Sequence, residues 1–509
     1  MSVATVSTIA FHGLQPIAVQ VQAHVGKGLP AFHIVGLADK AVAESKERIK
    51  SALQSIGLSL PAKRVVINMS PADIQKEGNH YDLPIILSIL EALEIIPQDY
   101  LKDWIIMGEI SLDAQISHVT GALLAAVFAA NSNKGLICPA SCGKEAKWGG
   151  DLNILAPLNL IQLLNHIKGI QLCPEPPITH TKDRKNDQDF ADVKGHESIK
   201  RALEISAAGK HHTLMIGPPG AGKSMLSERM NTILPELSTK EALEVSMIYS
   251  VSNLNNKSGL IKKRPFRAPH HNSSLPSIIG GGYKCKPGEI SLAHHGILFM
   301  DELSLWAPSV LNGLRESIET GHISVARANG NIQYPAQFQL IAAMNPCICG
   351  HAYDLEQRCG KFPVCYNNYI NKIPGPIWDR FGIIISIDKL SPWELSEING
   401  KSKSSAEMKH DVEKAITMQK TRYAGLSFSC NHNVPSSKIG ILNVSQEAME
   451  LINKYAKSIN MSNRRYYNSI KIARTIADIE GSVSVQTNHI EESISYNIFQ
   501  KNISPVQIK

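Results

Sequence analysis

The sequence predicts an α/β protein of several domains, and three observations carry that prediction. The chain has 509 residues, which is too long for a single hydrophobic core. A segment rich in proline and charge, 171–190, interrupts it. Before and after that segment, short β-like runs alternate with helix-like runs, and the part beyond residue 390 is rich in helical patterns.

The domain boundaries follow from these breaks. We expect an α+β domain over 1–168, a linker over 169–190, an α/β core over 191–390 and a helical domain over 391–509. The first domain should contain strands at 16–25, 31–36 and 63–69, where β-branched residues are frequent. A second polar segment, 400–411, should introduce the helical domain.

The composition narrows the class of protein. The chain is 43% hydrophobic and 19% charged, which is ordinary for a soluble protein. The apolar run at 83–96 contains glutamates, and the first residues lack the pattern of a secretory signal, so we expect no membrane span and no export. Nine cysteines, most of them isolated, favour a reducing compartment and hence the cytoplasm. The net charge of +7 is compatible with an anionic polymer as partner but does not prove one.

The core contains a complete phosphate-binding loop of the form G-x-x-x-x-G-K-S. An apolar run, 213–216, precedes the loop as a short strand, and a helix should follow it. Backbone N–H groups of such a loop surround phosphates, the lysine contributes positive charge, and the serine hydroxyl is a Mg²⁺ ligand. The predicted nucleotide-binding residues are Gly217, Pro218, Pro219, Gly220, Ala221, Gly222, Lys223 and Ser224.

A second strand should end in a pair of carboxylates. The run 297–300 is apolar throughout and is followed by Asp301 and Glu302. Either carboxylate alone could cap the next helix, but the pair beside a phosphate loop fits metal binding and proton abstraction better. We therefore predict that Asp301 binds Mg²⁺ and that Glu302 is the general base.

Three further polar residues are candidates for the same reaction. Asn345 ends the strand expected at 338–345 and could orient a water, although asparagine at such a position is often only a turn former. Arg380 precedes an apolar strand, and Arg464 opens a predicted helix. Phosphoryl transfer needs cationic charge in its transition state, but as isolated residues both arginines could equally form surface ion pairs.

The order of these motifs resembles the YifB/ComM family of magnesium-chelatase-like ATPases of the AAA+ class. The resemblance rests on the segments at 192–225, 266–282, 286–303, 342–350, 375–381 and 472–481, and it covers nearly the whole chain. It implies a hexameric ring that binds ATP and Mg²⁺ between subunits. By match to the family's motifs, Asn345 resembles a first sensor, Arg464 a second sensor and Arg380 the arginine finger that reaches the neighbour's ATP.

The resemblance also implies a substrate. ComM-type proteins are DNA branch-migration motors, so we rank a DNA motor first. A chelatase-type motor subunit and an ATP-dependent protein-remodelling factor are the alternatives. The insertion at 262–290 is cationic and glycine-rich, which suits a loop that follows a phosphate backbone, but it could equally pack subunits together.

The N-terminal domain resembles the proteolytic domain of Lon proteases without its catalytic groups. The residues Asn79, His80 and Tyr81 occupy the place of the serine nucleophile, and Leu123 occupies that of the lysine base. Without a nucleophile or a base, peptide cleavage is not expected.

The segment 347–365 holds four cysteines. The family usually has two C-x-C pairs here, which look like a four-thiolate zinc clip. In this chain Cys347 and Cys349 form the first pair and Cys359 matches the third position, but Lys361 stands at the fourth and Cys365 follows later. Zinc bound by these four thiolates and reduced, unligated thiols both remain open.

Overall fold

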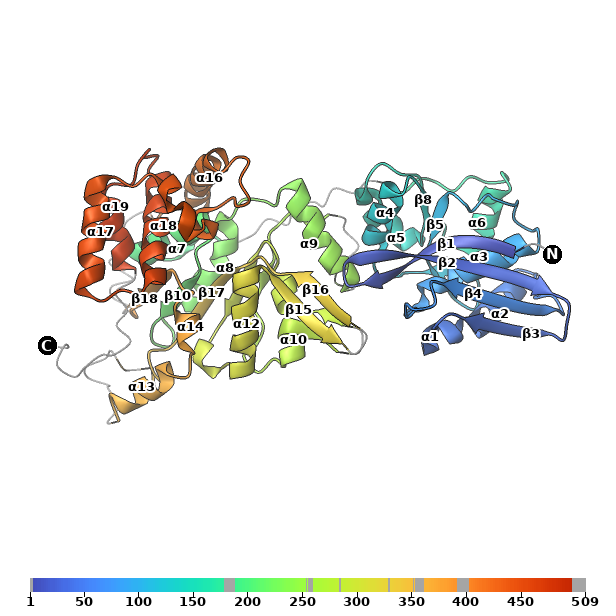
Figure 1. Cartoon of the computed structure of the whole chain (residues 1–509), viewed down its shortest axis with the longest axis horizontal. Helices are drawn as coiled ribbons and strands as arrows, with labels where there is room; N and C mark the ends of the chain where they lie inside the picture. The colour runs from blue at the N-terminus through green and yellow to red at the C-terminus, as the bar shows by residue number, and fades with distance from the viewer. Residues whose placement is uncertain are drawn as a thin grey trace. The chain divides into compact units, whose positions relative to one another are not determined.

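The computed structural model describes residues 3–177, 188–252, 254, 260–282, 285–327, 330–350, 352, 361–390 and 402–496. The chain forms two compact units (Figure 1). The first comprises Met1–Asp183 and Ser238–Lys262, and the second comprises Arg184–Leu237 and Lys263–Lys509. The helix α9 (Thr239–Val251) therefore groups with the first unit, which the sequence pattern does not indicate. Among the described residues, no helix combines the length and the apolar character that crossing a bilayer requires.

The first unit is built on a seven-stranded mixed sheet of order β3-β4-β2-β1-β5-β8-β9. The pairs β1–β2 and β2–β4 are antiparallel, whereas the other neighbours are parallel. The strands predicted at 16–25, 31–36 and 63–69 are β2, β3 and β4. The strands are β1 (Val3–His12), β2 (Gln15–Gly26), β3 (Ala31–Val35), β4 (Arg64–Ser70), β5 (Trp104–Ile106), β8 (Gly135–Ile137) and β9 (Ile154–Leu155), and a separate pair is β6 (Glu109–Ile110) with β7 (Ile116–Ser117).

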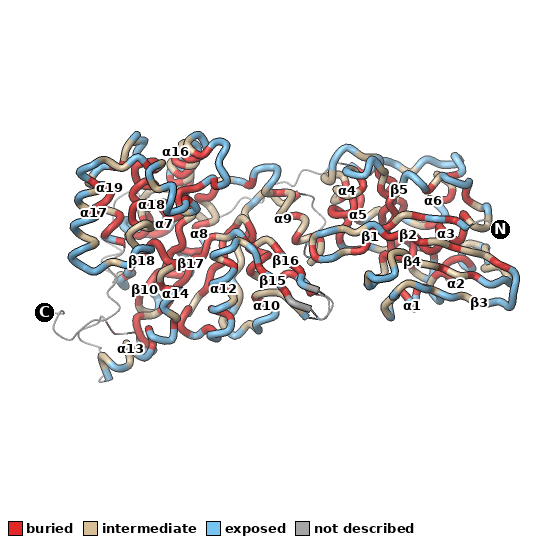
Figure 2. The backbone as a smooth tube through the Cα atoms, viewed as in Figure 1, coloured by how far each residue is buried: buried red, intermediate tan, exposed pale blue. Residues whose placement is uncertain are grey.

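The core of the first unit surrounds α3 (Asp82–Ala92), which is buried along almost its whole length (Figure 2). Its first residue, Asp82, is a fully buried carboxylate that accepts a bond from Arg48 Nε at 2.7 Å. Breaking such a pair leaves an uncompensated buried charge, which costs about 3–5 kcal/mol. The other elements are α1 (Lys40–Ala43), α2 (Ser45–Ser55), the 3₁₀ turn η1 (Asn79–Tyr81), α4 (Ala122–Asn131), α5 (Ala140–Ala146), the turn η2 (Lys147–Gly149) and α6 (Leu160–Ile167).

The second unit contains a five-stranded sheet in which every pair of neighbours is parallel. Its order is β11-β14-β17-β10-β18. All five strands therefore end at the same edge, which we call the carboxyl edge, and begin at the opposite, amino edge. The predicted strands at 213–216 and 297–300 are β10 and β14 with the same bounds. The strands are β10 (Thr213–Ile216), β11 (Phe266–Arg267), β14 (Ile297–Met300), β17 (Gln339–Met344) and β18 (Ile383–Ser386).

Helices and two hairpins surround this sheet. Buried residues of α7, α8, α16 and α18 share one core with the strands. The hairpins β12–β13 and β15–β16 lie side by side, since the Tyr334 hydroxyl donates to the Cys285 carbonyl at 2.7 Å. The elements are η3 (Phe190–Asp192), α7 (Glu197–Gly209), α8 (Lys223–Ile233), α10 (Leu275–Ile279), β12 (Gly280–Gly281), β13 (Lys286–Pro287), α11 (Glu289–Leu292), η4 (Leu303–Leu305), α12 (Pro308–Thr320), β15 (His322–Arg327), β16 (Gly330–Pro335), α13 (Val364–Ile370) and α14 (Gly375–Trp378).

The C-terminal part of this unit is helical. Ser404 caps α16 in a capping box with Glu407, so the helix begins within the polar segment 400–411. The fully buried Asp478 accepts bonds from Arg422 of α16 and Arg474 of α18 and thereby links these two helices. The elements are α16 (Ser405–Arg422), η5 (Asn431–Asn433), η6 (Ser436–Leu442), α17 (Gln446–Ser458), α18 (Asn463–Ile479) and α19 (Thr487–Ser495).

Candidate active site

The phosphate loop lies at the carboxyl edge, between β10 and α8. Lys223, the first residue of α8, turns its ammonium group back into the loop and donates to the carbonyls of Gly217 at 2.7 Å and Pro218 at 2.9 Å. Burial lowers the pKa of Lys223, and the charges of Asp301 and Glu302 partly oppose that shift. The loop therefore holds a buried cation within a concavity of the kind that binds phosphate.

The predicted magnesium ligands come together. Ser224 Oγ donates to Asp301 Oδ2 at 3.0 Å, although 77 residues separate them in the chain. A hydroxyl and a carboxylate side by side are oxygen donors of the kind that Mg²⁺ binds. The carbonyl of Asp301 also accepts from Trp306 Nε1 at 2.9 Å, which ties the start of the next segment to the strand end. This donor set fits Mg²⁺.

Glu302 has a left-handed backbone, with φ of 50°, an uncommon conformation for a residue other than glycine. Its N–H donates to Asp301 Oδ1 at 2.9 Å, and its Oε2 lies 3.1 Å from Nδ1 of His271. Non-glycine residues held in such a conformation cluster at functional sites, which supports a role for Glu302. From its sequence context His271 is expected to be a turn or interface residue, and its contact with Glu302 is not predicted.

Asn345 follows β17 and joins the same group. Its Oδ1 accepts from Lys223 Nζ at 3.0 Å. Tyr369 of α13 lies close by, since burial, followed by the charges of Glu302 and Cys347, raises the pKa of its phenol. Three parallel strands thus deliver Lys223, Asp301 with Glu302, and Asn345 to one edge, because β10, β17 and β14 are neighbours.

The two predicted arginines lie away from this group, at the amino edge. Arg380 comes shortly before β18 begins, and Gly382 N–H bonds the His212 carbonyl just before β10. The Arg380 side chain is 2% exposed and forms an ion pair with Glu319 of α12. Among the described residues, its Nε and Nη1 meet no hydrogen-bond acceptor.

Arg464, at the start of α18, also lies at the amino edge of the sheet. Burial lowers the pKa of Arg464. The nearby carboxylate of Asp379 opposes that shift, and the nearby guanidinium of Arg315 adds to it. Asp379 directly precedes Arg380. The structure therefore brings Arg464 and Arg380 into one region and separates both from the phosphate loop of their own chain.

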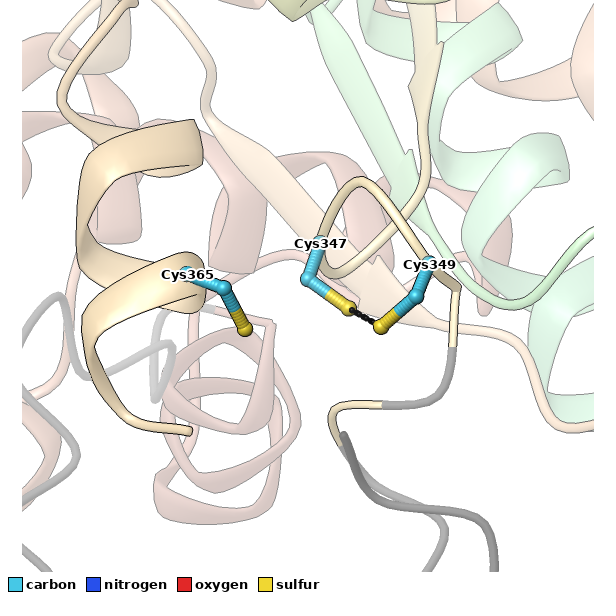
Figure 3. Close-up of side chains that lie close together, drawn as sticks. All are labelled: Cys347, Cys349 and Cys365. Atoms are coloured by element: carbon cyan, nitrogen blue, oxygen red, sulfur yellow. Dashed lines mark hydrogen bonds between the residues drawn. The ribbon is translucent and has the colours of Figure 1, made fainter. Parts of the chain in front are cut away.

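The cysteines form a cluster near the phosphate loop (Figure 3). The sulfur atoms of Cys347, Cys349 and Cys365 all lie within 4.8 Å of one another. Cys359, the other predicted zinc ligand, lies outside the described residues. The sequence pattern offers Cys365 as one possible ligand beside the first pair, and the structure brings its thiol to that pair.

The residues of the N-terminal unit compared in sequence with Lon-type catalytic groups make structural contacts. Leu123 is 1% exposed in the hydrophobic core. The buried His80 ring bonds the Ile9 carbonyl through Nε2 at 2.9 Å, and Asn79 donates to Glu109 Oε1 at 3.0 Å. These contacts serve the packing of the unit.

A parallel sheet that carries a phosphate loop, an acidic pair and a polar residue at the ends of three adjacent strands defines a P-loop nucleotide-binding protein. Family models agree. "Magnesium chelatase, subunit ChlI" matches 189–395, "Subunit ChlI of Mg-chelatase" matches 21–142, and "Magnesium chelatase, subunit ChlI C-terminal" matches 402–497.

Similar proteins identify the family. The competence protein ComM of Haemophilus influenzae is 35% identical over 97% of both chains. YifB of Escherichia coli is 37% identical over 100% of this chain and 99% of its own. The magnesium-chelatase 38 kDa subunit of Rhodobacter capsulatus is 26% identical over 31% of this chain and 50% of its own. The chain belongs to the YifB/ComM family of magnesium-chelatase-like AAA+ ATPases, and this membership implies the use of ATP and Mg²⁺.

Proposed function

We propose that this protein is an ATP-hydrolysing ring motor that acts on DNA and remodels branched recombination intermediates. The observation that carries the ring is the separation of its charged groups. The phosphate loop and the acidic pair lie at one edge of the sheet, whereas Arg380 and Arg464 lie at the other. Because one chain cannot bring both sets to one nucleotide, each site is completed by a neighbouring subunit. A hexamer is the closed ring that we propose.

Each residue then has a role. Lys223 compensates the charge of the terminal phosphates, and Ser224 and Asp301 hold the metal. Bound Mg²⁺ supplies further positive charge at the phosphates. Glu302 accepts a proton from the attacking water after its side chain leaves His271, and Asn345 orients that water. Arg380 of the adjacent subunit stabilises the transition-state charge, with Arg464 beside it.

The Arg380 side chain supports this assignment. A guanidinium that is 2% exposed and has two nitrogens without acceptors in the described part of its chain is costly, about 1–3 kcal/mol for each unsatisfied group. Such a cost is offset when an anion from a neighbouring subunit arrives. The ion pair with Glu319 is then the resting partner that the nucleotide phosphates replace.

The DNA part of the proposal rests on the family resemblance and on the paired hairpins β12–β13 and β15–β16. Lys286 is exposed on β13, and Gly282 is exposed with open space where a side chain would stand, so a phosphate chain could approach here. Arg267 does not contribute a free charge, because it pairs with Glu289 at 2.6 Å. Arg264 likewise donates to the carbonyls of Pro235 and His295. Tyr283, the aromatic residue of the insertion 262–290, lies outside the described residues. Fewer cationic side chains of the insertion 262–290 are therefore available to bind DNA than its sequence suggests.

The proposal also covers the N-terminal unit, the cellular compartment and the cysteine cluster. The N-terminal unit keeps a Lon-like fold without peptidase activity and contributes to assembly or to DNA contact. The isolated cysteines favour the cytoplasm. Zinc would have a structural part at the cysteine cluster and none in hydrolysis.

The decisive experiment measures ATP turnover by the full chain with forked DNA, four-way DNA and no DNA. We expect binding of the ATP-loaded ring to branched DNA and stimulation of turnover by it. Lys223→Ala should abolish nucleotide binding, and Glu302→Gln should bind ATP and accumulate a hexamer without turnover. Absence of both binding and stimulation with every DNA would refute the DNA motor. Stimulation by an unfolded protein or by a porphyrin-associated partner would favour the alternatives. Wild-type turnover in Glu302→Gln would remove Glu302 as the base.

A further inference from the structure

Three thiols from two separate elements meet at one point, which we call the thiol cluster. Cys347 and Cys349 lie on the turn after β17, and Cys365 lies on α13 (Figure 3). Their sulfur atoms are all within 4.8 Å of one another, and those of Cys347 and Cys349 are 3.1 Å apart. None of the described cysteines forms a disulfide. We propose that the thiol cluster binds one Zn²⁺ ion, which joins α13 to the turn and supports the phosphate loop.

The dimensions suit a zinc–thiolate site. With Zn–S bonds of about 2.3 Å, tetrahedral thiolates lie about 3.8 Å apart. The Cys347–Cys349 separation of 3.1 Å is below that value and no separation in the cluster exceeds 4.8 Å, so changes of about 1 Å at the three side chains are enough for the geometry. Hard cations such as Mg²⁺ prefer oxygen ligands, whereas Zn²⁺ prefers sulfur among common cellular divalent metals. The site is therefore separate in chemistry from the Ser224–Asp301 pair.

The position of the cluster indicates what the metal would do. The turn that carries Cys347 and Cys349 begins directly after Asn345 and closes at Gly350, whose N–H bonds the Cys347 carbonyl at 3.1 Å. Gly350 lies against the phosphate loop, because a Cβ on it would be 2.5 Å from Cδ of Pro219. A metal that fixes this turn also restrains the loop beneath it.

The helix α13, which carries Cys365, also carries a side chain that lies close to the ATP site. Tyr369 is one helical turn beyond Cys365 on α13, and its buried phenol lies near the Asn345 backbone and Glu302. The metal would hold α13, and with it Tyr369, against the group that contains Asn345 and Glu302. Zinc is thus a positioning element of the ATP site and takes no part in the chemical step.

The test is the metal content of the full-length protein, purified without chelators and measured by mass spectrometry. We expect about one zinc per chain. Cys365→Ser should lose most of it, whereas Cys365→His should retain zinc because imidazole is also a zinc ligand. Cys173→Ser is the matched control, since Cys173 is half-buried like Cys365 but lies in the other unit.

A second measurement does not depend on how well the variants fold. Titration of the wild-type thiols with a mercurial reagent should release zinc, detected by a coloured zinc indicator.

The effect on the ATP site is measured separately. Cys365→Ser should bind a fluorescent ATP analogue several-fold more weakly, and Cys365→His should restore that affinity. Metal-free protein with three reactive thiols, or a Cys347–Cys349 disulfide in fresh protein, would overturn the proposal. Zinc content does not depend on DNA or on turnover, so it can fail while the motor proposal stands.

Discussion

Mixing two inactive variants tests whether Arg380 acts on its own nucleotide or on that of a neighbour. The first variant is Arg380→Ala, which keeps the complete carboxyl edge. The second is Lys223→Ala, which keeps Arg380 but loses the ammonium that donates to the phosphate-loop carbonyls. Each variant alone should be inactive, because loss of an arginine finger typically costs 10³–10⁵-fold in turnover.

The size of the rescue follows from the positions of the two residues. In rings assembled at random from equal amounts, about half of the sites contain an intact Lys223, and about half of those face a neighbour with an intact Arg380. Turnover should therefore recover to about one quarter of the wild-type value if the sites work independently. If Arg380 served its own chain, recovery would be nil, since every chain carries one defect.

The assay is steady-state ATP hydrolysis after the two chains are mixed before assembly. The control mixes Lys223→Ala with Glu302→Gln. Both residues lie at the carboxyl edge of the same chain, so no site in such rings is complete and no recovery is expected. Equal recovery in the two mixtures, or none in the first, would refute the assignment of Arg380 to the neighbouring site.

Three further predictions concern single residues. Asn345→Ala should lower kcat by about 10²-fold while changing ATP affinity only slightly, measured by turnover and by fluorescent-nucleotide binding; unchanged kcat would exclude its role in orienting water. Gly350→Ala places a Cβ 2.5 Å from Pro219 and should destabilise the protein by about 1–3 kcal/mol and weaken ATP binding. Gly425→Ala has a similar positive φ but open space around it, so it should cost only about 1 kcal/mol and leave ATP binding intact; equal effects would contradict the packing argument. Burial lowers the pKa of His80 to about 4 from its usual 6.5. The unfolded chain therefore binds the proton more strongly, and stability should fall by about 3 kcal/mol as pH falls from 6.5 to 4; urea unfolding should show a smaller loss in His80→Gln, and an identical pH dependence would contradict this cause.

The local parts of the site could be predicted closely. The bounds of β10 and β14 match the prediction because a continuous apolar run followed by glycine or carboxylate is a strong local signal. The phosphate loop needs only residues adjacent in the chain, so its motif is sufficient to locate it. Asp301 and Asn345 could be placed at the same edge once both strands were expected in one parallel sheet.

The contacts that tune the site could not be predicted in this way. His271 beside Glu302 and Glu319 beside Arg380 are pairs of charged or polar residues with no fixed spacing. Pairs of this kind, formed between segments far apart in the chain, leave no periodic pattern in a sequence. The same holds for Gly350, whose contact with Pro219 depends on how two loops pack.

By itself, the sequence determined the fold class, the nucleotide chemistry and the family, because these depend on short motifs and on apolar periodicity. Only the tertiary structure decided which residues work together. It placed Arg380 and Arg464 at the edge opposite the phosphate loop, grouped α9 with the first unit and brought Cys365 to Cys347 and Cys349. Strand order and helix packing set these distances, since they join segments that are far apart along the chain.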